Sequence, residues 1–334
     1  MKDSEENRPV GAHTLETIYL PVSEELRQVE TILKEELTSR YEGVDRVVKH
    51  GFRLGGKRLR PALVLLSGKA AGNVTPDHRT LAAAVELIHT ATLVHDDVLD
   101  EAELRRHVDT VNARWNNETS ILLGDYLLTR ALCLAASTET TFACRLLGEC
   151  SRAMCEGELR QVLGRGDFRL SEEDYLEIIE GKTGALCACC CEFGAYYGDA
   201  PPAVRTALTR YGLLLGVAFQ IVDDLLDLLG EENTVGKSLG RDLEKRKLTL
   251  PLIHLFGKLE KGERRRFELI WNETEGDIRA FFQNARARRA AVEFARAKAE
   301  SLIAEAKDRL RPLEDSPGKE SLLALADFVL SRSH

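Results

Sequence analysis

The stretch 85–107 reads VELIHTATLVHDDVLDEAELRRH, and the rest of the chain is best interpreted outward from it. It begins as an apolar helical segment and continues without a helix breaker into DDVLD, residues 96–100. At helical pitch Asp96 and Asp100 stand on one face, about 6 Å of rise apart. Acidic side chains one turn apart repel unless a cation lies between them, and oxygen ligands suit Mg²⁺. On its own, this pattern is more often the solvated acidic end of a helix.

The same pattern returns in a second apolar helical segment. Residues 220–228 read QIVDDLLDL, which places Asp223, Asp224 and Asp227 at the same offsets. Ionised carboxylates among Leu, Val and Ile are costly unless they are paired or bind a metal. Two such clusters on two mostly apolar helices therefore favour two carboxylate walls that face each other across a cavity, with metal ions between them.

Composition favours a single all-α domain. The 334 residues are 44% apolar and only 6% aromatic, which is typical of a helical protein with a sizeable core. We find no strand pattern of any length, no short-period repeat and no low-complexity linker. We expect a flexible N-terminal segment, residues 1–13, followed by one domain over 14–334. The net charge of −8 argues against general nucleic-acid binding through a basic face.

The cysteines and the N-terminus indicate a cytoplasmic protein. Four of the eight Cys form CACCC, residues 187–191, without the separated pairs that a zinc site needs. We interpret them as small apolar residues packed against a neighbouring helix, in a reducing cytosol. The first residues are charged and lack the apolar region of a signal peptide. No run of eighteen apolar residues occurs, so no transmembrane helix is expected.

Three further features could contribute to an anion site. The loop GFRLGGKRLRP, residues 51–61, combines the adjacent glycine pair 55–56 with Lys57, Arg58 and Arg60, and suits a diphosphate as well as it suits an ordinary helix start. The segment GKTG, residues 181–184, interrupts a helical pattern but lacks the strand and upstream glycine of a P-loop. His89 lies about two helical turns before Asp96 on nearly the same face.

Together, the two acidic clusters, GGKRLRP and the GKT segment resemble the trans-isoprenyl diphosphate synthase, or polyprenyl synthetase, family over about residues 14–332. HTATLVHDD, residues 89–97, is most like the long-chain octaprenyl, heptaprenyl and solanesyl synthases. The resemblance implies the isoprenoid synthase fold, a bundle of antiparallel helices around a deep central cavity. It also implies an Mg²⁺-dependent condensation of an allylic diphosphate with isopentenyl diphosphate, by ionisation, condensation and elimination.

The resemblance assigns a role to each matching residue. Three Mg²⁺ ions are expected on Asp96, Asp100 and Asp223. Supporting or catalytic carboxylates are expected at Asp97, Asp224 and Asp227. The allylic diphosphate would contact Arg105, Lys182, Thr183, Gln220 and Lys237, of which Lys182, Thr183 and Lys237 are also counted as catalytic. Isopentenyl diphosphate would be held by Lys57, Arg60, His89 and Arg106. Lys247 matches a family lysine near the same site.

Two local departures from the family pattern occur. The family usually has Gly-Lys after the double Arg, where this chain has His107-Val108. It usually has Gly before the later Lys, where this chain has Arg246. Both departures put the conformation of their loops in doubt.

The residues before Asp96 predict the length of the product. Ala91 and Thr92, one turn before the motif, and Ile88 below them are not aromatic, whereas short-chain members of the family place Phe or Tyr here. We therefore predict a medium-to-long all-trans polyprenyl diphosphate. The family further implies a homodimer, and a lipid product makes peripheral membrane contact plausible.

Other functions remain open at this point. Within the family, the alternatives are a geranylgeranyl or farnesyl diphosphate synthase. A non-catalytic subunit of a heteromeric synthase would be expected to lose an acidic motif or basic ligands, and both are intact. A helical scaffold with chance acids would bind neither Mg²⁺ nor diphosphate. A terpene cyclase would not need the GGKRLRP site for a second diphosphate.

Overall fold

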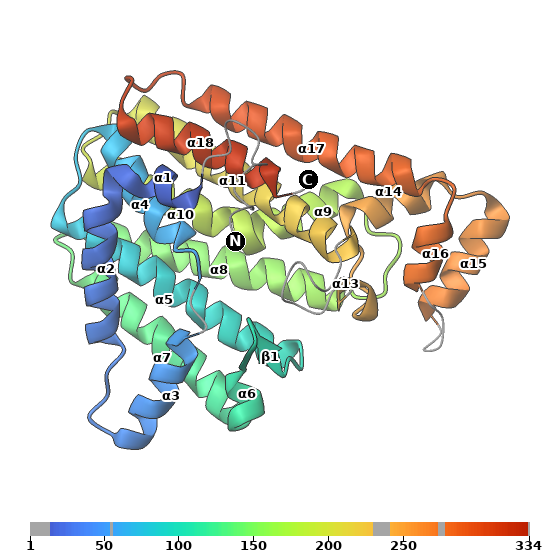
Figure 1. The fold of residues 1–334 in the computed structure, drawn as a ribbon, viewed down its shortest axis with the longest axis horizontal. Coiled ribbons are helices and arrows are strands. Elements are labelled where there is room, and N and C mark those ends of the chain that lie inside the picture. Colours follow the sequence, from blue (N-terminus) through green and yellow to red (C-terminus); the bar gives the residue numbers. More distant parts are fainter. Residues whose placement is uncertain (1–13, 54–55, 230–240, 273–277, 333–334) are drawn as a thin grey trace, which may run out of the picture.

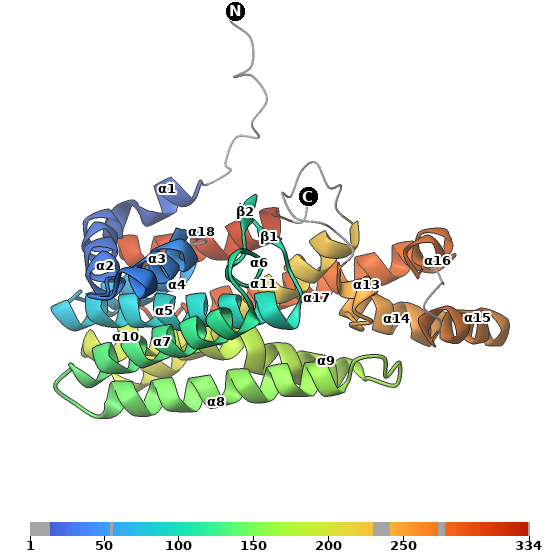
Figure 2. The same cartoon turned by 90° about the horizontal axis from the view of Figure 1, so that it is seen from below.

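The computed structural model describes residues 14–53, 56–229, 241–272 and 278–332. Over these residues the chain is a layered bundle of helices with one β-hairpin, whose two strands have two residues each (Figures 1 and 2). The helical elements are α1 (Leu15–Tyr19), the 3₁₀ turn η1 (Leu20–Val22), α2 (Ser23–Glu36), α3 (Glu42–Arg53), α4 (Leu59–Ala71), α5 (Pro76–Leu99), α6 (Val111–Arg114), α7 (Asn117–Ala136), α8 (Phe142–Leu163), α9 (Glu172–Ile179), the π-helical turn η2 (Glu180–Gly184), α10 (Ala185–Tyr197), α11 (Pro202–Leu229), α13 (Arg241–Glu244), α14 (Leu250–Lys258), α15 (Lys261–Asn272), α16 (Ile278–Asn284), α17 (Arg288–Arg309) and α18 (Pro317–Ser331).

The helices that carry the acidic motifs are central to the packing. Helix α5 packs on α4 and α7, while α11 packs on α10 and α17. Helix α10 contacts α4, α5, α8 and α11, and so links the two halves of the bundle. Helices α7 and α8 form the outer layer on one side, and α14–α16 project at one end (Figure 2). The predicted all-α bundle is therefore confirmed.

Close packing of α10 against α11 explains the cysteine-rich segment. The four Cys at 187, 189, 190 and 191 are buried. A Cβ atom on Gly212 of α11 would lie 2.4 Å from the backbone oxygen of Cys187, so only glycine permits this approach. The interpretation of CACCC as small residues packed against a neighbouring helix is confirmed.

Two short stretches depart from what the sequence pattern indicates. Apolar residues recur at helical spacing over residues 14–38, but η1 interrupts the helix at Pro21, because proline lacks the amide hydrogen and clashes with the preceding helical turn. No strand was expected, yet β1 (Leu104–Arg105) and β2 (Val108–Asp109) pair as an antiparallel hairpin. Two residues per strand are too few to produce an alternating pattern in the sequence.

Helix α7 is unusually apolar. Among the described residues it is the one helix long and apolar enough to cross a membrane by length and composition alone, with a mean hydropathy of 1.3. Core helices of soluble proteins share these properties, but only 39% of this apolar segment is buried. The outer face of α7 is therefore both apolar and exposed in the single chain.

Candidate active site

One short segment brings the two acidic motifs together. Lys245 forms an ion pair with Asp100 of the first motif, at the C-terminal end of α5. Two residues later, the Nζ atom of Lys247 lies 3.0 Å from Oδ1 of Asp224, in the second motif near the end of α11. One carboxylate of each motif therefore contacts the same short segment, residues 245–247.

Asp96 lies in a buried position among charges of both signs. Burial, with smaller contributions from Glu158 and Asp100, raises the pKa of its carboxyl group to about 6 against the opposing effects of Lys182 and Arg105. A group with this pKa gains from any cation placed beside it, because a positive charge favours the ionised form. The electrostatics therefore favour a cation at the end of α5.

The donor set of the site fits Mg²⁺. Within the described ranges, no three acidic, His or Cys side chains are grouped closely enough to form a complete protein cage for a metal. Mg²⁺ does not need such a cage, since it usually keeps several waters and binds one or two carboxylates together with substrate phosphates. Asp96, Asp100 and Asp223 present hard oxygen ligands of this kind, and these three residues could hold the ion.

The remaining carboxylates of the second motif hold other protein groups. Asp224 is buried and accepts hydrogen bonds from the hydroxyl of Tyr175 at 2.7 Å, the amide of Gln220 at 2.8 Å and the ammonium of Lys247. Asp227 accepts a hydrogen bond of 3.1 Å from the backbone amide of Asp242. Both residues thus anchor neighbouring elements of the fold.

Lys247 is held between two acids, the buried Asp224 and the half-buried Asp242. Its Nζ atom also lies 3.1 Å from Oδ2 of Asp242. Burial opposes the charged form, but Asp224 and Asp242 together raise the pKa of Lys247 above its usual value. Burial raises the pKa of Asp242 to about 6 despite the opposing effect of Lys247. The lysine therefore remains charged and ties the segment after α13 to α11.

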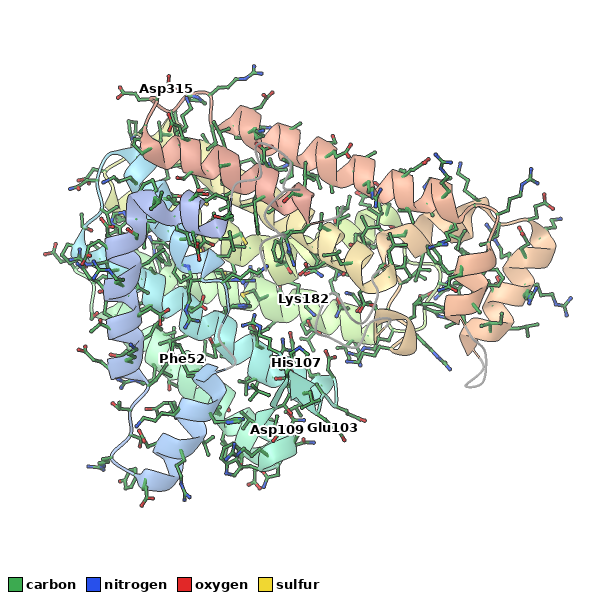
Figure 3. All side chains as sticks on the ribbon, in the orientation of Figure 1. Phe52, Glu103, His107, Asp109, Lys182 and Asp315 are labelled. Carbon is green, nitrogen blue, oxygen red and sulfur yellow. The ribbon has the colours of Figure 1, made fainter. Side chains whose placement is uncertain are left out.

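A close approach between α8 and η2 places Lys182 and Thr183. A Cβ atom on Gly157 would lie 2.7 Å from the backbone nitrogen of Lys182, so the two elements touch through their backbones. Lys182 forms an ion pair with Glu158, and Thr183 donates a hydrogen bond of 2.8 Å to Gln220. The predicted interruption at GKTG is a π-helical turn, an irregularity that is frequent at functional sites. Figure 3 shows Lys182 near the middle of the molecule.

The first motif fixes the first arginine of the double Arg. Nη2 of Arg105 lies 2.7 Å from Oδ1 of buried Asp97, and Nε donates to both oxygens of the same carboxylate. A forked contact of this kind fixes orientation as well as charge. Arg105, predicted to contact the allylic diphosphate, is therefore held in place by Asp97.

The side chains predicted to hold isopentenyl diphosphate gather near one another. Burial, then Arg60, Arg105 and Arg106, lower the pKa of His89 well below its usual value, so its imidazole is neutral at pH 7. Burial lowers the pKa of Lys57, with further effects from Arg332 and Arg106. Burial is the larger cause for both groups, and the neighbouring cations add to it, which favours an anion at this position.

Arg58 has a different task from the cations around it. Its guanidinium lies 2.7 Å from the buried carboxylate of Glu86 and also pairs with Glu30. These contacts join the start of α4 to α2 and α5. Of the three cations in GGKRLRP, Arg58 is therefore structural.

The predicted floor residues lie along α5 below Asp96. Ala91 and Ile88 are buried, and the half-buried Thr92 donates a hydrogen bond of 2.8 Å to the carbonyl oxygen of His89. Their effect on product length stays a prediction. Lys237 and the segment 1–13 lie outside the described residues.

Several contacts of the site were not predicted from the sequence. They involve Glu158, Tyr175, Asp242, Lys245 and Arg332. Arg332 at the end of α18 lies 2.9 Å from Asp223 although the two residues are far apart in the chain. None of these residues belongs to a spaced motif, so only the packing of the helices identifies them.

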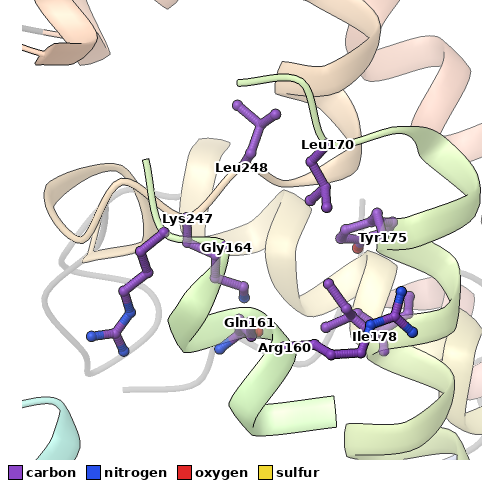
Figure 4. A pocket seen from close by; sticks show the side chains of 10 residues that line it. Arg160, Gln161, Gly164, Leu170, Tyr175, Ile178, Lys247 and Leu248 are labelled. Atoms are coloured by element: carbon purple, nitrogen blue, oxygen red, sulfur yellow. The ribbon is translucent and has the colours of Figure 1, made fainter. Parts of the chain in front are cut away.

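A small cavity lies behind the second motif. Its volume is about 20 Å³, and Tyr175, Ile178, Lys247 and Leu248 are among the residues that line it (Figure 4). That volume suits a single water molecule, which polar neighbours could hold. The cavity is too small for a prenyl chain and does not serve as the substrate site.

Comparison with known proteins identifies the family. The polyprenyl synthetase family model matches residues 42–285. The chain belongs to the polyprenyl synthetase family. The crystal structure of a decaprenyl diphosphate synthase from Rhodobacter capsulatus is 35% identical, with a TM-score of 0.89, and 96% of this chain and 100% of that chain are covered. The all-α fold is thus the isoprenoid synthase fold, and the predicted enzyme class, a prenyltransferase, is confirmed.

Two further relatives are informative about ligands and product length. The structure of a polyprenyl synthase from Caulobacter crescentus, complexed with calcium and isoprenyl diphosphate, is 34% identical, with a TM-score of 0.88 and coverage of 98% of this chain and 100% of that chain. A short chain isoprenyl diphosphate synthase from Methanothermobacter thermautotrophicus is 36% identical, over 86% of this chain and 90% of its own length. Similar proteins therefore carry both long-chain and short-chain names.

The two departures from the polyprenyl synthetase pattern have a common structural feature. His107 has a φ of 63° and Arg246 a φ of 54°, so both lie in the left-handed region that glycine occupies readily. The chain therefore keeps the backbone conformation that a glycine would favour, with a different side chain. The two substitutions therefore add backbone strain to these loops without changing their course.

Proposed function

We propose that this enzyme condenses an allylic diphosphate with isopentenyl diphosphate in the presence of Mg²⁺ and releases a medium-to-long all-trans polyprenyl diphosphate. One observation carries the proposal. The segment containing Lys245 and Lys247 contacts one carboxylate of each acidic motif, beside a group of cations that suits diphosphate. The relative from Caulobacter crescentus, complexed with calcium and isoprenyl diphosphate, supports the same ligand classes.

The reaction requires charge stabilisation at the leaving group. Asp96, Asp100 and Asp223 would hold up to three Mg²⁺ ions, which when bound would neutralise negative charge on the diphosphate. Arg105 and Lys182 donate hydrogen bonds to the diphosphate oxygens as the allylic carbon–oxygen bond breaks and both bonding electrons leave with the pyrophosphate.

The second substrate is held by the basic group beside α5. Lys57, Arg60 and Arg106 pair with the diphosphate of isopentenyl diphosphate, and neutral His89 adds a hydrogen bond without further charge. The double bond of isopentenyl diphosphate attacks the allylic cation, forming the new carbon–carbon bond. The proton then lost passes to the released pyrophosphate, so no Ser, Cys or His nucleophile is needed.

Small side chains along α5 favour a long product. Ala91, Thr92 and Ile88 leave the helix face below Asp96 without an aromatic ring that would block an elongating chain. A short-chain product is the second candidate, because the relative from Methanothermobacter thermautotrophicus carries a short-chain name. A non-catalytic subunit is disfavoured by the presence of both acidic motifs and the basic residues.

We also propose a cytoplasmic homodimer. All eight Cys are free thiols, which suits a reducing compartment. Leu122 on α7 and Leu159 on α8 are each 60% exposed. Figure 2 shows these two helices in the outer layer of the bundle. Such large apolar side chains on adjacent helices favour burial against a second copy. A lipid product would also bring the enzyme to the membrane surface during release.

Product analysis tests the proposed function directly. The purified enzyme is incubated with Mg²⁺, isopentenyl diphosphate and either geranyl, farnesyl or geranylgeranyl diphosphate, and the products are measured by mass spectrometry. We expect a series of polyprenyl diphosphates whose longest member has about six to ten isoprene units. The Asp96→Asn variant is expected to form no condensation product. Products of three or four units would establish the short-chain alternative, while absence of any condensation product would refute the proposal.

A further inference from the structure

Two of the three candidate metal ligands are paired with cations of the protein. Asp100 pairs with Lys245, and Asp223 lies 2.9 Å from the guanidinium of Arg332. Both carboxylates are 36% exposed, whereas the side chains of Lys245 and Arg332 are 23% and 24% exposed. In each acidic motif, one partly exposed carboxylate is therefore already paired with a cation of the protein.

Other parts of the structure hold each cation in position. Lys245 precedes Lys247, which is fixed between Asp224 and Asp242. The guanidinium of Arg332 lies 4.6 Å from the centre of the Phe219 ring, one helical turn before Asp223 on α11. A cation over an aromatic face is stabilised there. The pair at Asp223 therefore has a second contact that holds its cation, and the pair at Asp100 belongs to a segment that Lys247 fixes nearby.

These pairs have a consequence for metal binding. Mg²⁺ binds carboxylate oxygens directly, so it must compete with Lys245 at Asp100 and with Arg332 at Asp223. A diphosphate changes the balance, because its oxygens bind Mg²⁺ and also accept charge-assisted hydrogen bonds from a displaced lysine or arginine. The cations that oppose Mg²⁺ alone would therefore not oppose Mg²⁺ bound together with a diphosphate.

We propose that Lys245 and Arg332 are internal counter-ions that weaken Mg²⁺ binding until a diphosphate is present. Both are positioning residues that act through Asp100 and Asp223. This inference rests on the proposed function, because it assumes that these two carboxylates bind Mg²⁺. It deepens that function by making metal loading depend on the substrate.

Calorimetric titration of the full-length protein with Mg²⁺ alone tests the inference. We expect Lys245→Gln and Arg332→Gln each to bind Mg²⁺ roughly three- to tenfold more tightly than the wild type, in line with the modest energy of partly exposed ion pairs. Lys245→Arg keeps the charge and is expected to retain wild-type affinity. Lys307→Gln is the matched control, since Lys307 pairs with Asp327 between α17 and α18.

A second titration with inorganic pyrophosphate separates the two levels of the hypothesis. With pyrophosphate present, the difference between the wild type and the two Gln variants is expected to shrink to less than about twofold. No Mg²⁺ binding by the wild type, even with pyrophosphate, would overturn the proposed function. If Lys245→Gln and Arg332→Gln bind Mg²⁺ no more tightly than the wild type does, the counter-ion inference alone is overturned. Circular dichroism establishes that both variants are folded.

Discussion

At the residue scale, buried charge determines how the second acidic motif is built. Asp224 is fully buried and Lys247 is largely buried, which costs free energy unless each finds its partners. Tyr175 and Gln220 satisfy the other positions on the Asp224 carboxylate, so the motif is a closed hydrogen-bonded group. Removing one member leaves the remaining charges buried without compensation.

Lys247→Met tests this dependence. The variant leaves Asp224 and Asp242 without their shared cation, and we expect the free energy of unfolding to fall by about 3 kcal/mol. Urea denaturation at pH 7.5 measures the change. Lys307→Met removes an exposed ion pair of α17 and is expected to cost less than about 1 kcal/mol. Equal stability of the two variants would contradict the account of the Asp224 group.

A second prediction at this scale concerns the product. Thr92→Phe or Ala91→Phe places a ring on the face of α5 one turn before Asp96, and we expect it to stop elongation and shorten the main product. Mass spectrometry of the products with farnesyl diphosphate as primer measures this. Leu269→Phe is the control, because Leu269 is 53% exposed on α15. Unchanged product length in both α5 variants would defeat the floor hypothesis.

The chemistry-bearing residues were predictable where they repeat a spacing. Asp96 and Asp223 stand out because two DDxxD patterns occur on apolar helices, and an acid there needs a physical explanation. Lys245 and Arg332 were not predictable, because a single basic residue in a charged segment has no distinguishing pattern. Their importance depends on which carboxylate lies opposite, and only the packing of distant elements determines that.

At the element scale, the hairpin of β1 and β2 has an unusual turn. Its two central residues, Arg106 and His107, have φ values of 52° and 63°, the pattern of a type I′ turn. Such turns favour Asn and Gly, and a left-handed conformation costs other residues about 1–2 kcal/mol. A Cβ atom on Gly56 would lie 2.7 Å from Nη2 of Arg106, so the turn places this arginine beside the basic loop before α4, and the strain is located there.

Replacing His107 by glycine is expected to relieve part of this strain. We expect His107→Gly, and separately Arg246→Gly, to raise the free energy of unfolding by about 0.5–1 kcal/mol, since glycine occupies positive φ without steric cost. Thermal and urea unfolding measure the change. Asp109→Gly in β2 is the control and is expected to destabilise the hairpin. A loss of stability in His107→Gly would show that its side chain stabilises the turn.

The start of α5 carries a pH-sensitive element. His78 accepts a hydrogen bond of 3.0 Å from the Thr75 amide at Nδ1, and its Nε2 lies 3.0 Å from the carbonyl oxygen of Gly194 on α10. Both contacts are made by the neutral ring with its proton on Nε2. Burial lowers the pKa of His78, so the folded protein binds this proton less readily than the unfolded chain does.

The sign of the pH effect follows from that difference. Stability is expected to fall as the pH drops below about 6.5, where the unfolded chain takes up the proton. Urea unfolding at pH 7.5 and 5.5 measures the loss in the wild type. His78→Gln, which retains an N–H donor for Gly194, is expected to show a smaller loss over the same interval. An identical loss in the variant would exclude His78 as the cause.

At the scale of the whole molecule, the arrangement of helices leaves one face incompletely covered. Composition and helical periodicity predicted an all-α domain, but they did not indicate which apolar faces would lie outside. Helix α7 packs one side against α5, while its other side and that of α8 remain exposed. Leu163 of α8 is 84% exposed, more than a single soluble chain would favour for a leucine beside other exposed leucines.

The dimer proposal predicts how this face responds to charge. The double variant Leu122→Glu, Leu159→Glu places two carboxylates on it, and we expect a dimeric wild type to become monomeric, because burying unpaired charges is costly. Size-exclusion chromatography with light scattering measures the mass. Leu269→Glu adds a carboxylate on exposed α15 and is expected to leave the dimer intact. A monomeric wild type would refute the proposed dimer. A double variant that remains a folded dimer would show that the subunit contact lies elsewhere. In either case the exposed apolar face of α7 and α8 would need another explanation.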